Sequence, residues 1–170
     1  MNKLDQITLK MIEHDAGSAK RIQHFLKVHR FAQLIGRAEQ LDEHLQFILE
    51  CAAIVHDIAI GPCKKKYGRC TGDLQEKEGP AYARELLAAF DLPEEDIQRI
   101  CYLVAHHHSY HSIDGLDYQI LVEADFLVNL YEEQISPEGI ESTLERIFKT
   151  QTGIKLCKTQ FAVNKSQETV

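Results

Sequence analysis

The stretch that decides the fold is DEHLQFILECAAIVHDIAI, residues 42–60. Leu45 and Leu49 recur in it at helical spacing, which predicts a helix with one buried face. The same face continues to His56, and Asp57 follows directly. Two ionisable side chains therefore stand where a buried helix face normally carries apolar ones.

Helical spacing continues on both sides of this stretch. Apolar residues recur at steps of three and four, whereas the alternation typical of strands is absent. Only four prolines and nine glycines interrupt the pattern. The sequence predicts a single-domain, all-α bundle of six to seven helices at residues 1–157, followed by a poorly specified tail at 158–170. Helices are expected at residues 3–14, 18–40, 42–60, 74–90, 91–108, 116–133 and 136 to about 153, with loops at 61–73 and 109–115.

Composition narrows the class of protein. The chain has 170 residues, of which 44% are hydrophobic and 26% charged, as in one globular domain. A formal net charge of −7 disfavours general binding to nucleic acid. No segment approaches the ~18 uninterrupted apolar residues of a membrane helix, and the charged start of the chain is unlike a secretory signal. Five cysteines without framework spacing favour a reducing, cytoplasmic location.

Further polar residues occupy inward positions of other expected helices. His24 begins an apolar stripe, Asp125 lies within another, and His107 and His108 end a third. A buried carboxylate is costly unless it is paired or binds a metal, and imidazole with carboxylate is a typical ligand set for divalent transition metals. The sequence therefore predicts a metal centre, with manganese, iron, cobalt, nickel and zinc all open. A buried ion-pair network without metal is the alternative.

Three segments give the sequence a family resemblance. They are HFLKVHRFAQLIG from residue 24, CAAIVHDIAI from residue 51 and LVEADFLVNL from residue 121. Over residues 18–132 the chain resembles the HD-domain superfamily of metal-dependent phosphohydrolases. The resemblance implies a helical bundle around a central metal and hydrolysis of a phosphoester or phosphoanhydride. The metal ligands that it implies are His24, His56, Asp57 and Asp125.

Two positions depart from the pattern of the family. Some members place a second-metal histidine where this chain has Glu78, so an oxygen ligand at that position or the lack of a second metal is implied. His107 and His108 are the later candidates for a second metal or for substrate. Many members also have a lysine at the position of Ile60, and Lys64 in the following expected loop is a candidate replacement for contacting substrate.

Other residues are candidates for catalysis or for direct contact with the substrate. Arg21 lies three residues before His24 on one helix, and its planar fork matches phosphate oxygens, so we assign it to the catalytic set. Asp57 joins that set because its second oxygen can orient the nucleophile. Tyr110 and His111 follow the histidine run, where a tyrosine can stack on a base and a histidine can reach a phosphate.

The sequence thus favours a metal-dependent phosphohydrolase whose small-molecule substrate is a nucleotide of unspecified kind. The alternative is a non-catalytic module that binds a nucleotide or a metal and signals to a partner, and a metal-stabilised interaction domain is a third possibility. A separate zinc site at Cys63 and Cys70 has less support, because the chain lacks zinc-finger spacing. A homodimer is the default oligomer for such a chain, although no interface is marked.

Overall fold

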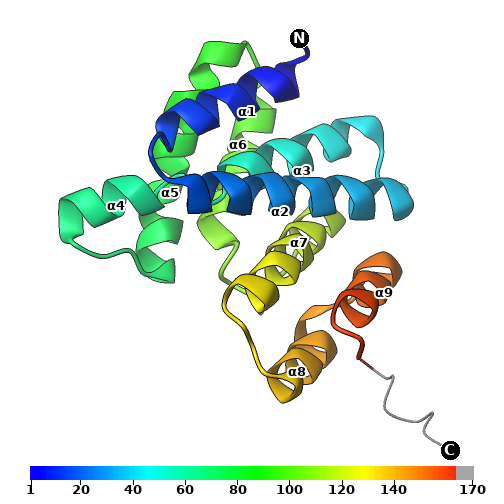
Figure 1. The fold of residues 1–170 in the computed structure, drawn as a ribbon. Coiled ribbons are helices and arrows are strands. Elements are labelled where there is room, and N and C mark those ends of the chain that lie inside the picture. The colour runs from blue at the N-terminus through cyan, green and yellow to red at the C-terminus, as the bar shows by residue number, and fades with distance from the viewer. Residues whose placement is uncertain (164–170) are drawn as a thin grey trace, which may run out of the picture.

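The computed structural model describes residues 1–163, and that part of the chain is helical without strands (Figure 1). It confirms the expected all-α class and the single domain. The tail expected at 158–170 begins inside the last helix, and residues 164–170 lie outside the described residues. The helices are α1 (Lys3–His14), α2 (Ala19–Ala38), α3 (Glu43–Val55), α4 (Ile60–Tyr67), α5 (Gly72–Leu87), α6 (Glu94–His106), α7 (Leu116–Glu132), α8 (Pro137–Ile147) and α9 (Gln151–Gln160), with a short 3-10 turn at Ala88–Phe90.

Helix α3 is the centre of the fold, with α2, α6 and α7 packed around it (Figure 1). It begins at Asp42, whose carboxylate accepts a hydrogen bond from the backbone of Leu45 at 2.9 Å. Every residue from 48 to 56 is buried. By length and composition the helical stretch Glu43–Tyr67 would suffice to cross a membrane, but 67% of its apolar window is buried inside the fold. The apolar side chains of this stretch therefore belong to the hydrophobic core of the fold.

The loop expected at 61–73 is wrong over most of its length. Residues 60–67 form α4, and only residues 68–71 connect it to α5. Pro62 falls in the first turn, where no intrahelical N–H is required, and Lys64–Lys66 fall in the last turn, where cations stabilise the carbonyl end. Gly68 then ends the helix at a φ of 73°. The residues that suggested a loop are therefore the start and stop signals of a short helix.

The last expected helix is wrong as one continuous element, because it is split into α8 and α9. A buried carboxylate on α7, that of Glu123, causes the break. It accepts hydrogen bonds from the backbone of Lys149 at 2.6 Å and of Thr150 at 2.9 Å, and from the Thr150 hydroxyl. Thr150 in turn caps α9 by accepting from the backbone of Gly153 at 2.9 Å. Glu123 thus holds the junction of α8 and α9 against α7, and apolar residues of both helices, among them Ile140 and Cys157, join the core.

Candidate metal centre

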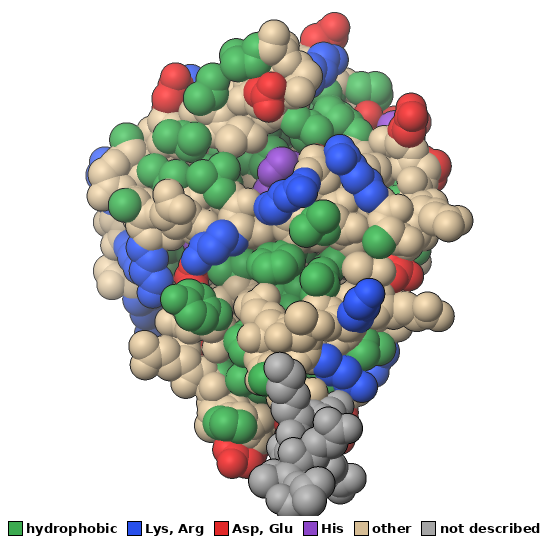
Figure 2. All heavy atoms as spheres, turned by 45° about the vertical axis from the view of Figure 1, so that its right-hand side comes forward, with side chains coloured by type: hydrophobic (Ala, Val, Ile, Leu, Met, Phe, Trp, Pro, Cys, Tyr) green, Lys and Arg blue, Asp and Glu red, His purple; other side chains and the backbone are tan. Residues whose placement is uncertain are grey.

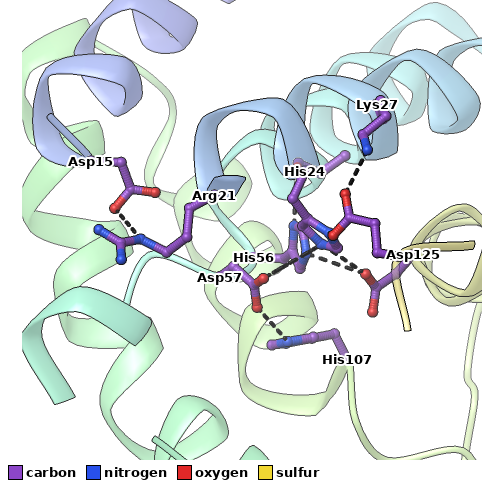
Figure 3. Close-up of polar contacts among 10 residues, drawn as sticks. Asp15, Arg21, His24, Lys27, His56, Asp57, His107 and Asp125 are labelled. Atoms are coloured by element: carbon purple, nitrogen blue, oxygen red, sulfur yellow. Dashed lines mark hydrogen bonds and ion pairs between the residues drawn. The ribbon is translucent and has the colours of Figure 1, made fainter. Parts of the chain in front are cut away.

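Five ionisable side chains from four parts of the chain meet beside α3 (Figure 3). His24 comes from α2, His56 and Asp57 from the end of α3, His107 from the end of α6, and Asp125 from α7. The three imidazoles are buried, and Asp57 is the most open of the five, with 16% of its side chain exposed. The structure therefore brings all four of the ligands implied by the family resemblance together, and adds His107.

The three imidazoles are held in the same way. His56 and His107 each donate from Nδ1 to a backbone carbonyl three residues earlier, at 2.9 and 2.8 Å. His24 donates from Nδ1 to the carboxylate of Glu132 at 3.2 Å. A carbonyl or a carboxylate can only accept, so each Nδ1 carries a proton and each Nε2 is turned toward the cluster. Such anchoring is the usual support of metal-binding histidines.

The first group of ligand atoms surrounds Nε2 of His24. This atom lies 3.1 Å from Oδ1 of Asp125, 3.3 Å from Nε2 of His56 and 3.5 Å from Oδ2 of Asp57. Nε2 of His56 lies 3.5 Å from the same Asp125 oxygen. Ligand atoms of His24, His56 and Asp57 all lie within 4.8 Å of one another. Their spacing is that of a set of donors arranged around a common point.

The electrostatics of this group favour cation binding. Burial alone would raise the pKa of Asp57, but the charge of His56 outweighs it and lowers the pKa to about 2. Hydrogen bonds from His24 and His56 likewise hold the pKa of Asp125 below its usual range against the effect of burial. Burial lowers the pKa of His56, yet the charge of Asp57 raises it to about 9. Both carboxylates are therefore ionised, and a metal must compete with protons for the imidazoles.

A second group of ligand atoms shares Asp57 with the first. Asp57, His107 and His108 also bring donor atoms within 4.8 Å of one another, and Oδ1 of Asp57 lies 3.7 Å from Nε2 of His107. The Nε2 atoms of His107 and His108 are buried and have no hydrogen-bond partner among residues 1–163. Burial, followed by the charge of His107, lowers the pKa of His108 to about 4, so its ring is neutral.

This second group is the test of whether a metal fits. A buried polar atom without a partner is rare, because it loses its hydration without compensation. Two such nitrogens, on histidines that group with one ionised carboxylate, belong to a donor set that lacks only an acceptor of lone pairs. A divalent cation satisfies that need. The residues present therefore fit one metal ion at the first group and a second at the other, with Asp57 between them.

Arg21 lies beside this arrangement, whereas Glu78 is engaged elsewhere. Figure 3 shows Arg21 beside Asp57 with its guanidinium turned toward Asp15, to which Nε donates at 2.9 Å. Glu78 accepts from the Tyr67 hydroxyl at 2.9 Å and from Lys66 at 3.2 Å. It belongs to neither group of candidate ligands within residues 1–163. The structure therefore keeps Arg21 next to the site but does not bring Glu78 to it.

The expected substrate contacts lie on two different segments. Lys64 is exposed on α4, and His111 is exposed in the loop after α6. Tyr110 packs edge-on against Phe126, with ring centroids 5.2 Å apart. Burial and then the charge of Asp125 raise the pKa of Tyr110 to about 12, which keeps its hydroxyl neutral. Tyr110 and His111 are thus close to one another, while Lys64 is on a separate helix.

Glu132 and Asp15 are supporting residues that the sequence reading missed. Glu132 stands seven residues after Asp125, and this two-turn spacing was a usable sign that both face the site. It also accepts from Lys27 at 2.5 Å. Asp15 gave no sign, since it follows α1 across a turn and its role depends on how α1 and α2 meet.

The helices and the buried histidine–aspartate cluster define an all-α domain with a candidate metal centre. The model of the HD domain family matches residues 21–143, a span that includes all candidate ligands of both groups. The chain therefore belongs to the HD-domain family, and the resemblance seen in the sequence is confirmed. HD domains typically bind divalent metals, in keeping with a cluster that can hold one.

A solved structure has the same fold. The chain is similar to the crystal structure of a predicted HD superfamily hydrolase from an uncultured Thermotogales bacterium, with a TM-score of 0.67 and 22% sequence identity. The alignment covers 94% of this chain and 85% of that chain. At this identity the likeness speaks for the shared fold. No match was found among curated proteins.

Proposed function

We propose that the protein is a metal-dependent phosphohydrolase that cleaves a phosphoester or phosphoanhydride of a nucleotide. The observation that carries this proposal is the position of Asp57 between two groups of buried imidazole donors, two of which lack a partner. A purely structural network would satisfy its own buried nitrogens. Membership of the HD-domain family supports metal-dependent hydrolysis in general terms.

The ligand assignment follows from the two groups. His24, His56, Asp57 and Asp125 would hold the first ion, and Asp57, His107 and His108 would hold a second. When bound, a divalent metal supplies Lewis-acid stabilisation of phosphoryl oxygens and lowers the pKa of a coordinated water. The identity of the ion stays open among manganese, iron, cobalt, nickel and zinc.

Arg21 is the proposed phosphate contact of this chain. Asp15 is buried and binds only its Nε, so both terminal NH2 groups of the guanidinium have no partner among residues 1–163. That arrangement fixes the fork while leaving two parallel donors for phosphate oxygens. Asp57, as the most exposed carboxylate of the cluster, is the group placed to orient the nucleophile. Lys64, Tyr110 and His111 remain proposed substrate contacts.

The test is release of phosphate or nucleoside from a panel of nucleotides, including dinucleoside polyphosphates and monophosphates. Each metal is added separately, and Asp57→Ala is assayed beside Asp5→Ala, an exposed acid on α1. We expect Asp57→Ala to lose at least about a hundredfold in turnover while remaining folded, and Asp5→Ala to match the wild type. Full turnover in Asp57→Ala would refute the proposal. If the wild type releases neither phosphate nor nucleoside with any of the metals, a non-catalytic binding module is favoured.

The proposal extends to surroundings and partners. All five cysteines are free thiols, which suits a reducing compartment such as the cytoplasm. On the face in Figure 2, lysine and arginine side chains stand in separate groups with other side chains between them, which is unlike a continuous track for nucleic acid. A small molecule is therefore the proposed partner. A homodimer is a further proposal, checked by sedimentation equilibrium.

A further inference from the structure

A pocket of about 490 Å³ opens between α7, α8 and the loop after α6. Two residues that line it are close in sequence to candidate metal ligands. Tyr110 is two residues after His108, and Phe126 follows Asp125 directly. Burial and then the charge of Asp125 raise the pKa of Tyr110, so this wall of the pocket lies within electrostatic reach of the metal centre. Its lining consists of Tyr110, His111, Phe126, Thr143, Arg146 and Ile147.

The loop that carries Tyr110 is held firmly in place. The carboxylate of Glu76 accepts from the backbone of His108 at 3.1 Å and from the hydroxyl of Ser109 at 3.0 Å. The hydroxyl of Tyr118 donates to the Ser109 carbonyl. These contacts hold His108 and Ser109, the two residues that precede Tyr110. The loop between the second group of ligands and the aromatic wall of the pocket is therefore tied to α5 and α7.

The chemistry of the lining is that of a site for a flat, polar ring. Tyr110 and Phe126 supply aromatic surface, on which bases stack. Arg146 donates from Nε to the carbonyl of Ser142 at 3.2 Å, and no carboxylate pairs with it within residues 1–163. Its terminal NH2 groups are therefore available for ring acceptors, a role in which arginine is the common partner of bases.

We infer that this pocket binds the nucleobase of the substrate, with Tyr110 and Phe126 against the ring and Arg146 donating to its edge. This inference rests on the proposed function, which places the phosphate at the neighbouring metal centre. It makes Arg146 a specificity residue, although this residue lies beyond the segment matched by the family model. A substrate without a base would leave the pocket empty and would bind only through its phosphate.

Binding of a neutral nucleoside tests the pocket without any turnover. Adenosine, guanosine, cytidine and uridine are titrated into chelator-treated protein and followed by ligand-observed NMR. We expect saturable binding of at least one nucleoside to the wild type, weakened about tenfold in Tyr110→Leu and in Arg146→Gln. Leucine keeps an apolar contact with Phe126 but removes the flat ring. Arg30→Gln, an exposed arginine on α2, is the matched control and should bind like the wild type.

Turnover then separates this inference from the proposed function. With an active enzyme, Arg146→Gln should raise the KM for the nucleotide about tenfold and leave that for ribose 5-phosphate unchanged. Absence of turnover combined with nucleoside binding that the two variants weaken would refute the hydrolase and keep the pocket. Absence of nucleoside binding to the wild type, or equal weakening in Arg30→Gln, would overturn the inference even if hydrolysis is observed.

Discussion

Helices α2 and α3 carry two buried clusters of histidine and carboxylate, which differ in one respect. At the first, which contains His24 and Asp57, the same Asp57 also groups with His107 and His108, whose Nε2 atoms have no hydrogen-bond partner in the described part of the chain. At the second, Glu50 accepts from His29 at 2.9 Å, from Gln33 at 2.9 Å and from Gln46 at 2.8 Å. Both oxygens of the Glu50 carboxylate therefore accept hydrogen bonds from side chains of the protein.

The difference separates a structural network from a binding site. Both clusters place a histidine of α2 opposite an acid near α3, so residue type alone does not distinguish them. What distinguishes them is the kind of atom that has no partner among residues 1–163: imidazole nitrogens, which bind metals, at the first cluster, and a single amide oxygen, Oε1 of Gln46, at the second. We therefore expect the first to respond to metal and chelator, and the second to respond only to changes that break its hydrogen bonds.

The largest expected effect on stability comes from removing the carboxylate of Glu50, around which the second cluster is built. Glu50→Ala leaves the donors of His29, Gln33 and Gln46 facing a cavity, and we expect a loss of about 3 kcal/mol in the free energy of unfolding. Urea unfolding measures it. Glu13→Ala, an exposed acid on α1, is the control and should change stability by less than about 0.5 kcal/mol. A loss below about 1 kcal/mol for Glu50→Ala would contradict the account of this cluster.

Metal should stabilise the protein by binding at the first cluster alone. A free metal concentration one hundred times the dissociation constant adds about 2.7 kcal/mol to the free energy of unfolding. We expect this gain in the wild type and in Glu50→Ala, and its absence in Asp57→Ala. Thermal unfolding with and without chelator gives the measurement. An equal gain in Asp57→Ala would show that the ion binds elsewhere.

The support of His24 should matter less than the ligands themselves. Glu132→Gln replaces the carboxylate that accepts from Nδ1 of His24, and we expect metal affinity to fall by about 10- to 100-fold. Equilibrium dialysis gives the affinity, and the bound ion's spectrum, with cobalt as the probe, reports on ligand geometry. A merely structural role would lower the melting temperature and leave the dissociation constant of cobalt unchanged.

The smallest expected effect is a change with pH in the stability that Glu50 of the second cluster contributes. Burial would raise the pKa of Glu50, but the hydrogen bond from His29, aided by Gln46 and Gln33, lowers it. A carboxylate whose pKa is depressed on folding stabilises the protein above its unfolded pKa, and this stability is lost as the pH falls through the folded pKa. We expect wild type and Glu50→Gln to converge in stability below about pH 4. A constant difference across the acid range would argue against it.

The candidate ligands could be predicted from the sequence because a charged side chain on the buried face of a helix stands out from its apolar neighbours. His24, His56 and Asp125 each break an apolar stripe, and breaking a stripe requires a reason. The supporting contacts were not visible, since His24 and Glu132 are 108 residues apart and meet only through the packing of α2 against α7. The short helix α4 was missed because glycine, proline and lysine can both end and begin helices.

Two of the three buried acids of α7, Glu123 and Asp125, are compensated in different ways. Asp125 faces imidazoles and a place for an ion, which solvent can exchange. Glu123, two residues earlier, faces the peptide N–H groups of Lys149 and Thr150, whose dipoles are part of the covalent chain and cannot diffuse away. A chelator would therefore remove an ion from one side of α7 while the contacts of Glu123 with Lys149 and Thr150 on the other side stay in place. The fold of the C-terminal helices is thus expected not to depend on whether the candidate centre holds a metal.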